Sequence, residues 1–140
     1  MLTRYEKFAV FNLCIVLCAV LLFLLLLGPI GFTGAQSAFG IIGFIGIGHL
    51  LFLRKRNSSD IVEDERDTAI KLKASGIGYY ISMAYFIIAS LSVYYSQSGT
   101  GVISVELLPF FAWIGWAIYI VSSSVIALIL YRQGVACGTC

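Results

Sequence analysis

No charged residue occurs between Lys7 and Arg54, and between Lys73 and Arg132 the only one is Glu106. Stretches of this length leave too few polar side chains to cover a water-soluble globule. The chain is 60% hydrophobic and 11% charged, whereas soluble domains are roughly 45–50% apolar and about 25% charged. With 140 residues it has the size of one domain, so the lipid bilayer must be part of its solvent.

The apolar runs predict four membrane-spanning helices. The first covers about residues 8–27, which at roughly 1.5 Å per residue is about 30 Å, the thickness of one hydrocarbon core. Gly28 and Pro29 are expected to end it, because proline cannot continue the helical hydrogen bonds. The other spans are expected at about 35–53, 77–95 and 107–130. The expected fold is all-α: an integral membrane bundle of four transmembrane helices with a cytoplasmic helix between spans two and three, in one domain, 1–140.

The positions of the basic residues predict the orientation. With four spans, both termini and the loop between spans two and three lie on one side, and these segments hold all nine Lys and Arg residues. Because basic residues are retained on the cytoplasmic side, we expect a protein of the cell membrane with cytoplasmic termini. The alternative for the first span is a cleaved signal peptide, with small residues at 34–38, but its apolar stretch exceeds the 7–15 residues of a typical signal.

Glycines recur every third residue on the expected second span, at Gly40, Gly43 and Gly46. Helices in lipid associate through close fit, and small residues allow their backbones to approach. The stripe therefore predicts a helix-packing face. It serves either a neighbouring helix of the same chain or a second copy of the protein.

The inner loop, residues 54–76, has the signals of a helix. Asp60 can cap its start, with Glu63 three residues later as the reciprocal partner. No helix breaker occurs before Gly76, so this helix can continue into the third span.

Acidic residues occupy one face of that predicted helix, because they recur at i, i+3, i+4 and i+7. They are Asp60, Glu63, Asp64 and Asp67. Like charges at this spacing cost about 0.2–0.5 kcal/mol per pair in a helix, so something should offset the repulsion. Solvent and the neighbouring basic cluster at 54–56 would suffice, and the functional alternative is a docking face for a basic partner or a cation.

The segment from Asp64 to Ala74 resembles a family of small, functionally uncharacterised prokaryotic four-helix membrane proteins, in which a D-E-R-D motif, an isoleucine and a lysine-alanine pair precede the third span. The matching residues are Asp64, Glu65, Arg66, Asp67, Ile70, Lys73 and Ala74. The end of the fourth span, at Tyr131 and Arg132, is also similar. The resemblance implies the four-helix layout and no particular activity, so it assigns no catalytic residue.

The four cysteines form two pairs. Cys14 and Cys18 share one face of the first span, and Cys137 and Cys140 form a C-x-x-C motif near the end of the chain. Thiolates bind soft metals, and this layout resembles the small bacterial mercury-uptake membrane proteins, in which thiolates would pass a soft ion from a membrane pair to a cytosolic pair. A closed zinc site usually needs four ligands. The alternatives are small buried hydrophobic residues for Cys14 and Cys18 and a reactive tail for Cys137 and Cys140.

No nucleophile, base and orienting residue occur in a catalytic pattern. The only histidine is His49, near the inner end of the second span, where a structural role is expected. Glu106 lies at the outer boundary and can cap the fourth helix. We expect a non-enzymatic interaction or regulatory module that uses the acidic helix, without cofactor or nucleic acid, with the bilayer, a cytosolic protein and a second copy as candidate partners. Soft-metal binding or transport and thiol oxidoreductase activity stay open as alternatives.

Overall fold

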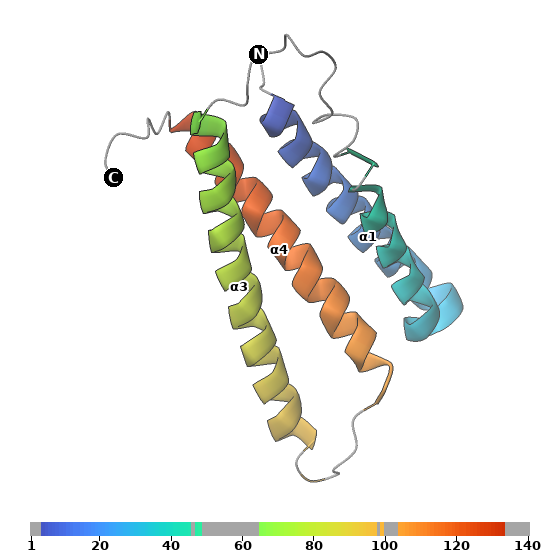
Figure 1. Ribbon diagram of the computed structural model, residues 1–140. Helices are drawn as coiled ribbons and strands as arrows, with labels where there is room; N and C mark the ends of the chain where they lie inside the picture. Colours follow the sequence, from blue (N-terminus) through green and yellow to red (C-terminus); the bar gives the residue numbers. More distant parts are fainter. Residues whose placement is uncertain (1–3, 46, 49–64, 98, 100–103, 134–140) are drawn as a thin grey trace.

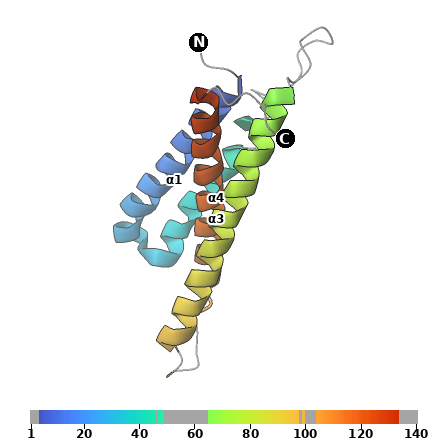
Figure 2. The same cartoon turned by 90° about the vertical axis from the view of Figure 1, so that its left-hand side faces the viewer.

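The structure, a computed structural model, describes residues 4–45, 47, 48, 65–97, 99 and 104–133. These residues form the α-helix α1 (Arg4–Ala35), the 3-10 helix η1 (Gln36–Gly43), and the α-helices α3 (Glu65–Gln97) and α4 (Leu107–Arg132). Helix α4 lies between α3 on one side and α1 with η1 on the other (Figures 1 and 2). The beginnings of α1 and α3 and the end of α4 lie at the same end of the molecule (Figure 1), which we call the charged end.

The prediction of four spans with a separate cytoplasmic helix is wrong. Within the described residues, three segments are long and apolar enough to cross a membrane: Tyr5–Gly43, Glu65–Ser96 and Leu107–Arg132. Of the expected second span, 35–53, the structure describes the eight-residue η1 and further helical residues at 44, 45, 47 and 48. This described part is shorter than the roughly 20 helical residues that cross a hydrocarbon core. Residues 46 and 49–53 of that span lie outside the described residues.

The chain turns at Gly31, not at the expected breakers. Helix α1 continues through Pro29, and the break follows at Gly31, whose φ of 72° and ψ of 178° are open to glycine at little cost. Beyond it the chain folds back along α1: the ring of Phe39 lies 5.2 Å from that of Phe23, and Gly48 lies against the ring of Phe11. The apolar run from Tyr5 to Gly43 is therefore one segment bent on itself.

Helix α3 begins at Glu65 and runs for 33 residues without a break at Gly76. It is about 50 Å long at 1.5 Å per residue, which exceeds a hydrocarbon core of about 30 Å. Its charged first turns can therefore extend beyond the apolar layer. Within the described residues, the expected cytoplasmic helix is the beginning of α3 and not a separate element.

Close backbone contact joins α3 to α4. A Cβ added at Gly78 would lie 3.0 Å from Cβ and 3.1 Å from the backbone nitrogen of Ser123. One turn further along, the hydroxyl of Ser82 donates to the carbonyl oxygen of Gly115 at 2.9 Å. Small residues let the two helices approach, as expected for association in lipid.

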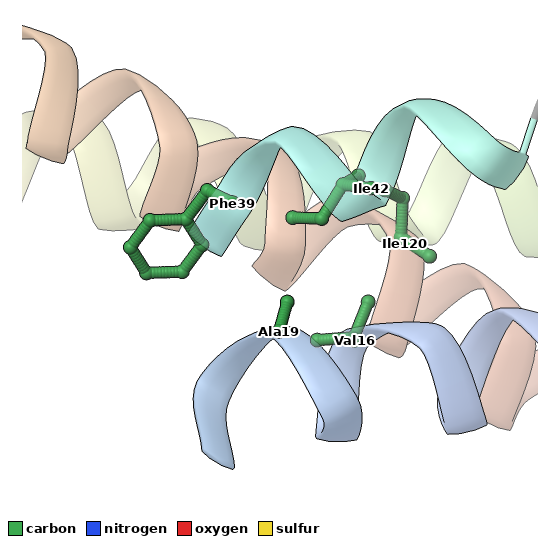
Figure 3. Packing of buried hydrophobic residues seen from close by; sticks show 5 residues of the cluster. All are labelled: Val16, Ala19, Phe39, Ile42 and Ile120. Carbon is green, nitrogen blue, oxygen red and sulfur yellow. The ribbon is translucent and has the colours of Figure 1, made fainter. Parts of the chain in front are cut away.

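The hydrophobic core joins α1 and η1 to α4. Its buried members are Val16, Ala19, Phe39, Ile42 and Ile120 (Figure 3). Trp113 stacks on Phe39 with an interplanar angle of 12°. These contacts hold the folded-back segment against α4.

Two glycines of the predicted stripe are described by the structure, and no other described residue packs closely on them. Gly40 and Gly43 are exposed, with no atom within 4 Å of a Cβ built on either. The placement of Gly46 lies outside the described residues. Tight packing occurs instead at Gly48, Gly78 and Gly115, and the self-association alternative for the stripe stays a prediction.

Candidate functional site

The charged end of α3 is anchored to the end of α4. The hydroxyl of Tyr131 donates to the Oδ1 of Asp67 at 2.8 Å. Ile70 and Ala74, three and seven residues after Asp67, are buried, whereas Glu65 and Arg66 are exposed. One face of the helix is thus held on the bundle, and the other presents charged side chains to its surroundings.

The predicted acidic face falls only partly within the described residues. Asp60, Glu63 and Asp64 lie outside them. Asp67 is half-buried and bonded to Tyr131, so part of its role is internal. The residues of the D-E-R-D segment that the structure describes therefore divide between an anchoring residue, Asp67, and the exposed Glu65 and Arg66.

A cleft of about 280 Å³ lies between the beginnings of α1 and α3, with α4 as its floor. Its polar residues are Tyr5, Asn12, Lys71, Ser75, Tyr119, Ser123, Ser124 and Tyr131, and its apolar ones include Phe8, Ile70, Trp116 and Ile120. The hydroxyls of Ser75 and Tyr119 share a hydrogen bond of 2.8 Å across the cleft floor. The ammonium of Lys71 lies 5.7 Å from the centre of the Tyr5 ring, a cation–π distance.

Asn12 and Ser124 are the buried polar residues described in this cleft, 8% and 4% exposed. The Nδ2 of Asn12 donates a long hydrogen bond, 3.5 Å, to the hydroxyl of Ser124. Within the described part of the chain, the Oδ1 of Asn12 is buried and has no hydrogen-bond partner. An unsatisfied buried acceptor costs about 1–3 kcal/mol, so this amide marks a position where a further polar group would be stabilising.

The cysteines that the structure describes lie at the surface. Cys14 and Cys18 are exposed on α1, away from the face that carries Asn12, Val16 and Ala19. Other described residues therefore do not cover them, and their role as small hydrophobic residues in apolar surroundings stays a prediction. Cys137, Cys140 and His49 lie outside the described residues, and among the residues described no three Cys, His, Asp or Glu side chains are grouped closely enough to hold a metal ion.

Glu106 occupies the N-cap position of α4, but its side chain makes no capping hydrogen bond there. Its carbonyl oxygen accepts a hydrogen bond of 3.0 Å from the Nε2 of Gln36. This contact ties the beginning of η1 to the beginning of α4, at the opposite end of the bundle from Asp67.

Sequence reasoning missed most of the cleft. Asn12 stands out in the sequence as the one strongly polar residue of its apolar run, but its partner Ser124 is 112 residues away. Ser75 and Tyr119 have no local signal, because a single serine or tyrosine in an apolar helix is common. Lys71 is visible in the sequence only as one of several basic residues.

Comparison with known proteins assigns a family and no activity. No curated protein and no solved structure matches the chain. One family model matches residues 7–135, and its description reads "predicted membrane protein". That match spans all the described helices apart from the first residues of α1, and it agrees with the three segments that are apolar enough to cross a membrane. The chain therefore belongs to the predicted membrane protein family DUF2178.

Proposed function

We propose that this protein is a non-enzymatic interaction module of the cell membrane, whose working surface is the charged end of α3. The observation that carries the proposal is the anchoring of this helix end. The hydrogen bond from Tyr131 to Asp67 and the burial of Ile70 hold it in place, while Glu65 and Arg66 face outward. A helix surface that is already ordered loses less conformational entropy when a partner binds.

The distribution of basic residues supports a cytoplasmic position for this end. The described basic residues all lie at the beginning of α1, the beginning of α3 or the end of α4, which share one end of the molecule (Figure 1). Cytoplasmic segments of membrane proteins carry such an excess of Lys and Arg. We infer that the charged end, with both chain termini, faces the cytosol.

Thiol labelling tests this orientation. In a background without native cysteines, Lys73→Cys at the charged end and Ser96→Cys at the opposite end are both exposed positions. A membrane-impermeant maleimide applied to intact cells is expected to label Ser96→Cys alone, and to label Lys73→Cys only after the membrane is opened. Labelling of Lys73→Cys in intact cells would reverse the orientation.

The partner we propose is a cytosolic protein with a basic surface. The acids Asp60, Glu63 and Asp64 precede the anchored turn of α3 in the sequence. Together with Asp67 they are four acids at helical spacing, which repel each other unless a positive charge is near. Complementary charge raises the rate of association and selects the partner. Because Asp67 is bonded to Tyr131, we assign docking to the other three acids and anchoring to Asp67.

Site-specific photocrosslinking tests this proposal. A photoreactive amino acid replaces Thr68, which is exposed beside the anchored turn, or Ser92, which is exposed toward the other end of α3. We expect a discrete protein adduct at position 68 and none at position 92. Reversing Asp60, Glu63 and Asp64 to lysine should abolish the adduct, and the control Glu106→Lys should leave it unchanged. An adduct that survives the triple reversal, or no adduct at position 68, contradicts the proposal.

A further inference from the structure

We propose that the cleft between α1, α3 and α4 binds a single-chain anionic amphiphile that carries a hydroxyl group between its charged head and its apolar tail. A lysophospholipid with a terminal phosphate has this chemistry. The inference goes beyond the interaction module proposed above, since it assigns binding to Asn12 and Lys71 in the cleft and not to the acids of α3. The cleft shares Ile70 and Tyr131 with the anchored turn. The inference rests on the polar groups, the charge and the shape of the cleft.

The polar lining leaves one group in need of a partner. The hydroxyl of Tyr131 is bonded to Asp67, those of Ser75 and Tyr119 to each other, and that of Ser123 to the carbonyl oxygen of Ile120. Only the amide of Asn12 combines a long hydrogen bond on one side with an unpartnered atom on the other, among the described residues that line the cleft.

A hydroxyl group is the partner that suits this amide. Asn12 lines the cleft, and its Oδ1 is covered by neighbouring atoms. The terminal torsion of an asparagine is soft, so the proposal requires this amide to turn toward the cleft when a ligand binds. The oxygen and nitrogen of an amide exchange places on a half-turn about that torsion. A hydroxyl both donates and accepts, and it satisfies the free side of Asn12 in either orientation.

The charge of the cleft selects an anion. Lys71 is the only charged residue among those described in its lining, and it is exposed above the ring of Tyr5. Two acids lie near the same end of the cleft without lining it. Asp67, one turn away on the same helix, is bonded to Tyr131, and Glu6 on α1 also acts electrostatically on Tyr131. A phosphate at the charged end of the cleft therefore meets an ammonium group at its rim.

The shape of the cleft fits one acyl chain. Phe8, Ile120 and Trp116 provide apolar walls, and Tyr131 and Trp116 are separated by about 22 Å along α4 at 1.5 Å per residue. The volume of about 280 Å³ lies just below the roughly 300–1,000 Å³ of pockets that enclose drug-sized ligands. It greatly exceeds the share of one water molecule in the liquid, about 30 Å³, so the cleft has room for a ligand larger than a few ordered waters.

Competition photolabelling tests this inference on the full chain in nanodiscs of zwitterionic phospholipid. The probe is a lysophosphatidate with a photoactivatable acyl chain, and the competitors are unlabelled lysophosphatidate and lysophosphatidylcholine of equal chain length. We expect labelling within the cleft that lysophosphatidate removes and lysophosphatidylcholine does not. Lys71→Gln should weaken binding about fivefold, the upper range for an exposed ion pair, whereas Lys73→Gln, which removes an exposed charge outside the cleft, should not.

A second arm tests the hydroxyl group. The wild type should bind lysophosphatidate about three to ten times more tightly than its analogue without the glycerol hydroxyl, and Asn12→Leu should bind the two equally. Equal competition by both headgroups, equal loss in Lys71→Gln and Lys73→Gln, or no preference of the wild type for the hydroxylated lipid would each overturn the proposal. The comparison of the two lipids on the wild type needs no variant. The protein adduct at position 68 is measured in a separate experiment, so failure of lipid binding is distinguished from failure of partner docking.

Discussion

Removing the hydroxyl of Tyr131 and the carboxylate of Asp67, singly and together, measures how strongly the beginning of α3 is held on the end of α4. The variants are Tyr131→Phe, Asp67→Ala and the double substitution. Alanine also raises helix propensity and removes a favourable charge from the first turn of α3, and both effects change the stability of Asp67→Ala. A double-mutant cycle cancels these effects and isolates the interaction between the two side chains.

The expected coupling follows from the geometry of the contact. The donor–acceptor distance is 2.8 Å, and hydrogen bonds to charged groups contribute about 1.5–3 kcal/mol. Both side chains are only half-buried, so water replaces part of the bond when it is lost. We therefore expect a coupling free energy of about 1 kcal/mol, a factor of about five in the unfolding equilibrium constant.

Reversible unfolding in mixed micelles, with the fraction of denaturing detergent raised stepwise, gives the free energy of unfolding for each variant. The control cycle replaces Asp67→Ala by Glu65→Ala, since Glu65 is an exposed acid on the same turn, and it should show coupling near zero. A coupling below about 0.3 kcal/mol for Asp67 and Tyr131, within the additivity expected of independent sites, would refute the anchoring on which the proposed working surface depends.

Two further predictions use the same unfolding measurement on matched glycine pairs. Gly78→Ala should destabilise the protein by about 1–3 kcal/mol, because its Cβ would lie 3.1 Å from the backbone of Ser123. The Cβ of Gly76→Ala meets no atom within 4 Å, so its higher helix propensity should raise the free energy of unfolding by up to about 1 kcal/mol. Gly31→Ala should cost about 1–3 kcal/mol, because its φ of 72° and ψ of 178° lie in a backbone region almost confined to glycine. Gly28→Ala, which meets no atom within 4 Å, should cost nothing. Equal effects within either pair would contradict the close contact or the reversal at Gly31.

The membrane character of the chain could be predicted from charge placement alone. The uncharged stretches before Arg54 and after Lys73 account for the apolar segments that the structure shows. They also predict that the charged ends of α1, α3 and α4 lie together, because charges leave the hydrocarbon layer wherever they can. That part of the fold is a property of composition along the chain, and it needs no knowledge of tertiary contacts.

The number and form of the spans could not be predicted in the same way. Gly28 and Pro29 signal a break, yet the helix continues past both and the reversal occurs at Gly31. A glycine or proline lowers the cost of a turn at several neighbouring positions and does not select one of them. Phe23 packs against Phe39 when the chain reverses at Gly31. Hydropathy likewise does not distinguish an α-helix from the 3-10 helix at Gln36–Gly43, because the hydropathy of a segment depends on its composition and not on its helix type.

Asn12 shows where sequence reasoning ends and tertiary structure begins. A lone asparagine in an apolar helix costs free energy in lipid, so the sequence indicates that it needs a partner without indicating which one. Several serines follow on α4, and only the helix crossing selects Ser124 and leaves the Oδ1 without a bond among the described residues. Were Asn12 only a packing residue, Asn12→Leu would stabilise the protein and change nothing else. If Asn12→Leu is more stable and also binds the hydroxylated lipid and its analogue without the hydroxyl equally, the Asn12 amide lowers the stability of the protein but contributes to binding.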